Sequence, residues 1–150
     1  MQINILMSTY NGEKYLSQQI ESIIAQTETK WRLIIRDDGS KDNTVSIIKQ
    51  FVDQDKRIEF VQGENVGVIN SFFQLVKHSK ADFYFFCDQD DVWLPNKLEL
   101  MLNVAMSCKD DVPLLVYSDL KVVDSSLNVL HHSMIDELTG PPSTNLKEEM

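Results

Sequence analysis

The sequence contains few of the features that would place a protein in a specialised class. Its only two cysteines, Cys87 and Cys108, have the spacing of neither a metal site nor a redox motif. Cys87 ends an apolar run and Cys108 lies on the apolar face of a predicted helix, so we expect both to be reduced core residues. No apolar run approaches the roughly 18 residues that a membrane span requires, and residues 1–4 lack the basic charge that opens a signal peptide. We therefore predict a cytoplasmic protein without a transmembrane segment. The sequence leaves peripheral association with the inner face of the plasma membrane open.

Basic residues are also in the minority. The chain has 14 lysines and arginines against 23 aspartates and glutamates, which gives a net charge of −9 at pH 7. Because binding to a phosphate backbone requires a basic surface, this charge argues against a nucleic-acid partner. It also disfavours purely electrostatic docking on anionic lipid, although it leaves room for a local basic patch.

Several well-known binding motifs are absent. The sequence has no Gly-x-Gly-x-x-Gly fingerprint and no P-loop, so ordinary dinucleotide and Walker-type sites are unsupported. Neither acidic run has the spaced acids and central glycine of an EF-hand. We expect no catalytic role for His78, His131 or His132, because no serine–histidine–acid arrangement can be argued from their spacing.

The pattern that is present alternates strand-like and helix-like segments. With 150 residues, of which 43% are hydrophobic, the chain has room for one domain with a real core. Strands are expected at residues 3–8, 31–36, 58–61 and 83–87, each followed by an amphipathic helix. Four such units predict an α/β fold with a mostly parallel sheet, flanking helices and right-handed crossovers. The third helix is expected to bury Ile69, Phe72, Phe73 and Val76.

The remainder of the chain is less regular. A fifth strand is expected at residues 114–117, and residues 121–123 and 129–130 resemble a small hairpin or an extended excursion. The pattern fades after Ser133. We therefore predict one domain over residues 1–133 and a loop-like or disordered tail over residues 134–150.

The most informative segment is an apolar run at residues 83–87 that leads into Asp88, Asp90 and Asp91. Such a run is typical of a strand buried on both faces of a parallel sheet, where ligands bind outside the carboxyl ends. Neighbouring carboxylates repel one another unless a cation compensates them. Mg²⁺ and Mn²⁺ take oxygen ligands and share them with substrate phosphates. The cluster predicts a metal-dependent site for a phosphorylated ligand; alternatively, one of the acids caps the helix that starts near Pro95.

Three other polar clusters follow strands and would meet at the same edge of the sheet. Residues 8–13 offer hydroxyls, an aromatic face and a carboxylate for a base or a ribose, or form only a capped turn. In residues 37–40, Asp-Asp-Gly-Ser, a carboxylate can accept a hydrogen bond from a pyrimidine ring, or the segment serves as a turn and N-cap. The glycines of residues 63–67 favour a tight turn.

These segments together carry a family resemblance. Residues 7–16, 37–40, 65–67 and 87–93 resemble, in order and spacing, family 2 inverting glycosyltransferases from residue 3 to about residue 120. Residues 88–98, Asp-Gln-Asp-Asp-Val-Trp-Leu-Pro-Asn-Lys-Leu, are most similar to the bacterial rhamnosyltransferase branch, which builds cell-surface polysaccharide. The resemblance implies the Rossmann-like glycosyltransferase A fold, a nucleotide-diphosphate sugar donor, and Mn²⁺ or Mg²⁺.

The resemblance also implies roles for individual residues. Thr9, Tyr10 and Glu13 would line the nucleoside pocket, and Asp38 would bind a uracil or thymine ring. Asp88 would face the ribose or the metal, and Asp90 would ligate the metal that bridges both phosphates. Asp91 would contribute to the metal or only cap and orient the loop.

The expected function is therefore metal-dependent, inverting transfer of a sugar, with rhamnose favoured, from a dTDP- or UDP-sugar. The acceptor would be a saccharide or lipid-linked saccharide in cell-surface polysaccharide synthesis. By the resemblance, Asp88 and Asp90 form the Asp-x-Asp element of the family. Family members carry the general base well downstream of this element, and here Asp119, Asp124 and Asp136 match no motif that identifies a base. We therefore expect the fold to be incomplete at its C-terminus, and the alternative function is a nucleotide-sugar-binding module without turnover. A phosphate-accepting signalling domain would need an isolated nucleophilic aspartate and a lysine on a later strand; Lys121 is the only candidate lysine, and the Asp-Gln-Asp-Asp cluster of residues 88–91 fits this class poorly.

Overall fold

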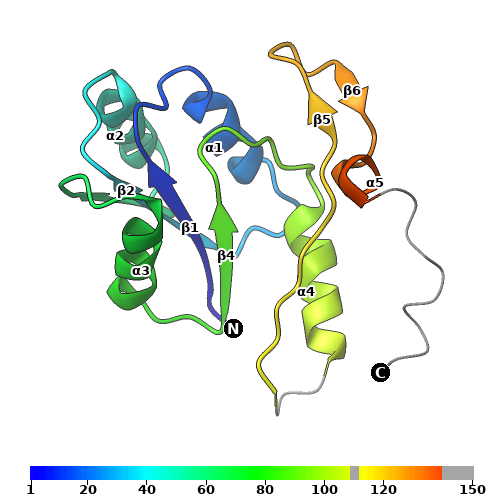
Figure 1. The fold of residues 1–150 in the computed structure, drawn as a ribbon. Coiled ribbons are helices and arrows are strands. Elements are labelled where there is room, and N and C mark those ends of the chain that lie inside the picture. Colours follow the sequence, from blue (N-terminus) through cyan, green and yellow to red (C-terminus); the bar gives the residue numbers. More distant parts are fainter. Residues whose placement is uncertain (109–111, 140–150) are drawn as a thin grey trace. The chain divides into compact units, whose positions relative to one another are not determined.

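The computed structural model describes residues 1–108 and 112–139, which fall into two compact units, Met1–Leu100 and Met101–Met150. The first unit contains a four-stranded, fully parallel sheet in the order β3-β2-β1-β4 (Figure 1). Its strands are β1 (Ile3–Thr9), β2 (Arg32–Asp37), β3 (Ile58–Gln62) and β4 (Phe83–Cys87). The predicted parallel sheet is confirmed.

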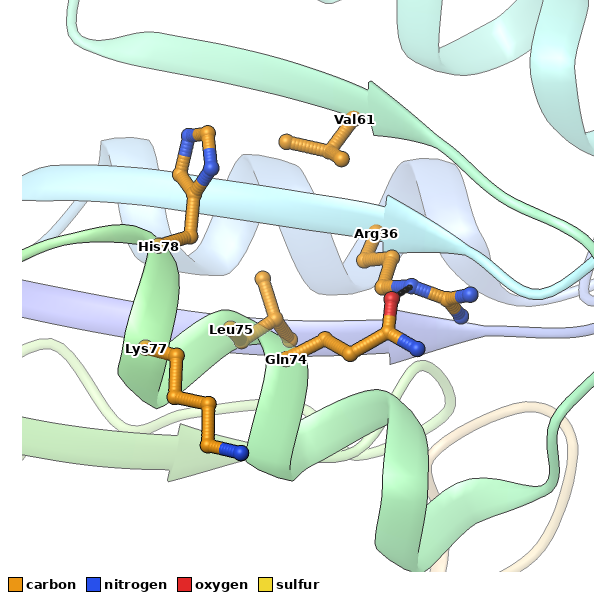
Figure 2. Close-up of a pocket in the computed structure, with 6 residues that line it drawn as sticks. All are labelled: Arg36, Val61, Gln74, Leu75, Lys77 and His78. Carbon is orange, nitrogen blue, oxygen red and sulfur yellow. Dashed lines mark hydrogen bonds between the residues drawn. The ribbon is translucent and has the colours of Figure 1, made fainter.

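Helices cover both faces of this sheet. α1 (Leu16–Ile24) and α2 (Thr44–Gln54) lie on one face, and α3 (Val68–His78) lies on the other (Figures 1 and 2). The chain therefore adds strands in one direction from β1 to β3 and then crosses back to place β4 on the other side of β1. This reversal is a topological switch point, where open α/β sheets bind their ligands at the carboxyl ends of the strands.

The central strands form the core. The apolar side chains of β1 and β2 are buried on both faces of the sheet, as expected of parallel strands between helices. β4 behaves differently, because it pairs only with β1 and forms an edge of the sheet of the first unit. Phe86 is 55% exposed and only Phe85 and Cys87 of this strand are buried. The expectation that residues 83–87 are buried on both faces is therefore wrong for the described chain.

The face that α3 turns to the sheet also differs from the prediction. Ser71 and Leu75 are buried, and Phe72 packs against the core residues Leu6 and Ile34. Ile69, Phe73 and Val76 are instead exposed. The hydroxyl of the buried Ser71 accepts hydrogen bonds from the Ser8 hydroxyl and from Nη1 of Arg36, so a polar residue occupies the centre of the inner face. Apolar periodicity cannot show such a position.

The second unit is smaller. The division between the units falls within α4 (Lys97–Ser107), which is followed by the antiparallel pair β5 (Val122–Val123) and β6 (Val129–His131) and by α5 (Met134–Thr139). The predicted hairpin is confirmed. Residues 114–117 form no strand, and residues 134–139 are helical and not loop-like. The rest of the expected tail, residues 140–150, lies outside the described residues.

The structure separates the two cysteines. Cys87 is buried at the end of β4, whereas Cys108 is exposed after α4, so only the first is a core residue. Burial raises the pKa of the Cys87 thiol to about 12. None of the described helices is both long and apolar enough to cross a bilayer.

Candidate functional site

A pocket of about 340 Å³ lies at the switch point of the sheet, where β1, β2 and β4 end. Four loops line it: Ser8 and Tyr10 at the end of β1; Asp38 after β2; Asn65, Gly67 and Val68 before and at the start of α3; and Asp88, Gln89 and Asp90 after β4. The four polar clusters therefore meet at one edge of the sheet, as predicted. Of the predicted site residues, the pocket brings together Tyr10, Asp38, Asp88 and Asp90.

The two acids of the Asp-Asp-Gly-Ser turn, Asp37 and Asp38, have different structural roles. Asp37 is fully buried, and its Oδ2 accepts hydrogen bonds from the backbone N–H groups of Gly39 (3.1 Å) and Ser40 (2.9 Å). Its Oδ1 accepts a hydrogen bond from the hydroxyl of Thr9 at 3.1 Å. Asp37 thus holds the turn, and Thr9 supports it from the interior without lining the pocket. Successive side chains of a strand point in opposite directions, so Ser8, next to Thr9, faces the pocket instead.

Asp38 lines the pocket although it is only 3% exposed. Its Oδ1 accepts hydrogen bonds from Nη1 of Arg36 and from the backbone N–H of Val66, and its Oδ2 accepts one from the backbone N–H of Gly67. Burial by itself would raise the pKa of Asp38, but these hydrogen bonds and the charge of Arg36 outweigh it and hold the pKa below its usual range. Asp38 is therefore a carboxylate at neutral pH.

Gln89 connects the acidic loop to the loop after β1. Its Oε1 accepts a hydrogen bond from the backbone N–H of Tyr10 at 2.9 Å, and its Nε2 donates to the carbonyl oxygen of Tyr10 at 3.3 Å. A Cβ atom added at Gly12 would lie 2.3 Å from Gln89 Oε1, so the close approach requires glycine there. Sequence reasoning missed Gln89, because nothing in an Asp-x-Asp pattern shows what the middle residue contacts.

Asp88 and Asp90 are exposed in the pocket, and neither side chain has a hydrogen bond or ion pair with a described residue. Asp91 does not line the pocket; burial and the negative charges of Asp88 and Asp90 raise its pKa, and Lys97 opposes this shift. Within residues 1–108 and 112–139, no three or more His, Cys, Asp or Glu side chains are grouped to hold a metal. Two unpaired carboxylates fit a hard divalent ion that takes its other ligands from phosphate and water.

The acidic loop is held from behind by the end of α1. The Ser22 hydroxyl accepts a hydrogen bond from the backbone N–H of Trp93 (3.0 Å), and Nε2 of Gln26 donates to the carbonyl oxygen of Leu94 (2.8 Å). Oε1 of Gln26 accepts a hydrogen bond from the backbone N–H of Leu98 at 3.0 Å, in the first turn of α4. A distant glutamine therefore caps this helix, and the expectation that one of the three aspartates does so is wrong.

Glu13 does not line the pocket either. Its Oε2 accepts hydrogen bonds from the backbone N–H (2.9 Å) and the side-chain Nδ2 (2.8 Å) of Asn43, just before α2. In return, Asp42 accepts a hydrogen bond from the backbone N–H of Glu13 at 3.1 Å. Glu13 therefore joins the loops that follow β1 and β2, and supports the pocket from outside.

The three carboxylates considered as a general base lie in the second unit. Oδ1 of Asp119 accepts hydrogen bonds from the backbone N–H groups of Met134 and Ile135 at the start of α5. Asp124 closes the turn between β5 and β6 through hydrogen bonds with Ser126 and Asn128. Hydrogen bonds lower the pKa of both carboxyl groups. The largest contribution comes from the Ser133 side chain for Asp119 and from the Asn128 side chain for Asp124. Asp136 lies in the first turn of α5, and we assign no base.

Comparison with known proteins gives the fold and the site a context. Residues 4–133 match the sequence profile described as "Glycosyl transferase family 2". An Escherichia coli protein named UDP-Glc:alpha-D-GlcNAc-diphosphoundecaprenol beta-1,3-glucosyltransferase WfgD is 30% identical over 125 residues, which are 83% of this chain and 47% of WfgD. The chain thus spans less than half the length of this relative.

Solved structures share the fold. TarS from S. aureus, residues 1–349 in complex with UDP, superposes with a TM-score of 0.65 at 23% identity, over 71% of this chain and 32% of TarS. The same TarS fragment in complex with UDP-GlcNAc gives a TM-score of 0.61 at 26% identity, over 70% of this chain and 30% of TarS. The sheet and helices of the first unit therefore have the nucleotide-sugar transferase architecture that the resemblance implied.

Proposed function

Because the chain belongs to glycosyl transferase family 2, we propose that its pocket binds the nucleotide diphosphate of a UDP- or dTDP-sugar for inverting sugar transfer. The observation that carries this proposal is the composition of the pocket. One buried carboxylate, Asp38, and two exposed, unpaired carboxylates, Asp88 and Asp90, line the same pocket at the switch point of the sheet. The similarity to TarS, solved with UDP-GlcNAc, supports this assignment.

The nucleoside end of the donor lies against Asp38. A carboxylate only accepts hydrogen bonds, and the imide N–H of uracil or thymine is a matching donor. The hydroxyl of Ser8 and the ring of Tyr10 supply the polar and aromatic surfaces that a ribose and a base require. Thr9 and Glu13, which the resemblance placed in this pocket, act behind it by holding the loops that carry Ser8 and Tyr10.

The diphosphate end lies against Asp88 and Asp90. These two residues would hold Mg²⁺ or Mn²⁺, and the phosphates would complete its coordination. When bound, the ion supplies Lewis-acid stabilisation of the departing diphosphate. Ser22 and Gln26 hold the backbone of the loop at Trp93 and Leu94, just after the two carboxylates.

The proposed function also includes the sugar that is transferred and the acceptor that receives it. Rhamnosyl transfer stays a prediction from residues 88–98, whereas WfgD is named as a glucosyltransferase. Transfer to a saccharide or lipid-linked acceptor requires a general base that removes the proton of the attacking hydroxyl. Asp119 and Asp124 have structural hydrogen bonds of their own, and this observation favours the rival function, a donor-binding module without turnover.

Calorimetry with UDP, dTDP and ADP, each with and without Mn²⁺, tests the donor site. We expect UDP and dTDP to bind in a metal-dependent way and ADP to bind at least tenfold more weakly. Equal binding of all three, or binding that ignores the metal, would contradict the proposal. Incubation with UDP-glucose and dTDP-rhamnose, followed by detection of released UDP or dTDP, then separates an enzyme from a binding module.

A further inference from the structure

Arg36, near the end of β2, is a buried cation whose partners connect it to the pocket. It is 2% exposed. Its Nη1 donates to Oδ1 of Asp38 and to the hydroxyl oxygen of Ser71 (3.0 Å), and its Nη2 donates to the carbonyl oxygen of Glu64 (3.0 Å). Its Nε donates to Oε1 of Gln74 at 3.0 Å. A buried charge is tolerated only with this degree of compensation.

The same residue lines a second cavity, of about 260 Å³, between β3 and α3. Figure 2 shows Gln74 extending to the Arg36 guanidinium, which points away from His78. His78 pairs with Glu59 at 2.6 Å instead. Four of the five N–H donors of Arg36 therefore already have protein acceptors.

The partners of Arg36 line or support the proposed nucleotide pocket at the end of β1, β2 and β4. Asp38 lines the pocket directly, and the Ser71 hydroxyl accepts a hydrogen bond of 2.6 Å from the hydroxyl of Ser8, another pocket residue. Glu64 belongs to the turn whose next residues, Asn65 and Gly67, line the pocket. A Cβ atom added at Gly63 would lie 2.2 Å from Nη2 of Arg36, so glycine at this position makes room for the guanidinium.

Arg36 also limits what Asp38 can accept. A carboxylate has about four acceptor sites, two on each oxygen. Arg36 and the N–H of Val66 occupy both sites of Oδ1, and the N–H of Gly67 occupies one site of Oδ2. One acceptor site remains. Uracil and thymine present a single N–H between two carbonyl groups, whereas guanine presents two adjacent donors that need two acceptors.

Building on the proposed function, we propose that Arg36 is a positioning residue that sets nucleotide selectivity: it fixes Asp38 with one acceptor site for an imide N–H and disfavours guanosine donors. A donor left unpaired in a buried site costs binding free energy, which makes the mismatch a basis for discrimination. The charge of Arg36 also keeps Asp38 in its acceptor-only state.

Calorimetry on the unaltered chain with UDP, N3-methyl-UDP and GDP gives the first test. We expect UDP to bind at least thirtyfold more tightly than either of the other two. If UDP does not bind at all, the proposed function fails. If UDP binds and GDP binds as tightly, the function stands and the inference about selectivity is overturned.

The variant Arg36→Lys gives the second test, because an ammonium retains the charge but cannot reproduce the planar fork of donors. We expect its UDP affinity to fall about tenfold while its GDP affinity stays the same or rises, so the UDP-to-GDP ratio shrinks. A purely structural role would lower both affinities by the same factor, and that result would overturn the proposal. Arg32→Lys is the matched control, since Arg32 lies at the other end of β2 in an exposed pair with Glu59. If Arg36→Lys does not fold, the comparison of UDP with GDP on the unaltered chain decides.

Discussion

The side chain of Gln89 forms two hydrogen bonds with the backbone of Tyr10: it accepts one from the N–H and donates one to the carbonyl oxygen. The two residues are far apart in the sequence and belong to loops that follow neighbouring strands, β1 and β4. These two hydrogen bonds fix the distance between the loop after β1, which carries Tyr10, and the loop after β4, which carries the acids. The middle residue of the Asp-Gln-Asp segment is therefore a structural part of the pocket.

Replacing Gln89 by alanine should weaken nucleotide binding and leave the fold intact. Each neutral hydrogen bond contributes about 1 kcal/mol, so the loss of two lowers the affinity for UDP by up to about thirtyfold. Isothermal titration calorimetry measures this change. Gln50→Ala, on the exposed side of α2, is the control and should bind UDP normally. Identical UDP affinities in Gln89→Ala and Gln50→Ala would show that the hydrogen bonds between Gln89 and Tyr10 do not shape the site.

Gly12→Ala should reproduce the effect of Gln89→Ala. The new Cβ atom would displace the end of the Gln89 side chain, which is flexible and can move without unfolding the protein. The two changes therefore remove the same interaction, and the double variant should bind UDP no more weakly than either single variant. Losses that add in the double variant would contradict this account.

Asp38→Asn should destabilise the fold in a pH-dependent way. The variant leaves Arg36 buried without its anionic partner, a loss of about 3–5 kcal/mol at neutral pH. Because folding lowers the pKa of Asp38, its stabilisation is complete above the ordinary value of 3.8 and is lost as the pH falls through the lower folded-state value. Thermal unfolding between pH 7 and pH 3 should show the two proteins converging only below about pH 3.8. A constant difference across this range would be evidence against a charged pair.

The thiols should differ in reactivity. Cys108 is exposed, whereas Cys87 is buried with its pKa raised to about 12 and accepts a hydrogen bond from Nε2 of Gln19. A disulfide reagent such as Ellman's should therefore label one thiol quickly in the native protein and the second only after denaturation. Rapid labelling of both in native buffer would show that β4 opens readily.

Gln26→Ala should destabilise the protein by about 1–3 kcal/mol, since it leaves the Leu98 N–H without its acceptor and removes one of the two hydrogen bonds to the Leu94 carbonyl, which keeps the one from the Lys97 N–H. Gln18→Ala, exposed on α1, is the control and should change stability by less than about 0.5 kcal/mol. Urea unfolding of the two variants measures the difference. Equal stability would mean that water replaces Gln26 at the start of α4.

The sequence predicted the sheet well because each apolar run ends in a polar turn, and parallel strands bring those turns to one edge. It could not predict contacts between loops. Thr9 and Ser8 both carry hydroxyls, and only the direction of β1 decides that Ser8 faces the pocket while Thr9 supports Asp37. The start of α5 was missed although it has a local N-cap, since the Ser133 hydroxyl accepts a hydrogen bond from the Asp136 N–H; the further contact from Asp119, 15 residues from Met134, is one that a sequence cannot show.

The sequence also could not predict which residues of α3 and β4 are buried. The inner face of α3 has Ser71 at its centre, and a serine carries no apolar signal. The apolar run of β4 predicted burial on both faces, yet β4 is an edge strand of the described sheet. Neither property follows from periodicity, because each depends on which element lies alongside.

The most direct test of the account is the Mn²⁺ dependence of UDP binding in Asp90→Asn, with Asp91→Asn as the matched control outside the pocket. Asparagine keeps the shape of the side chain and removes its charge, so the change isolates the carboxylate. We predict that Mn²⁺ strengthens UDP binding at least tenfold in the unaltered chain and in Asp91→Asn, and by less than twofold in Asp90→Asn. Full Mn²⁺ dependence in Asp90→Asn, with the fold intact by circular dichroism, would contradict the central claim that this loop holds the ion that binds the diphosphate.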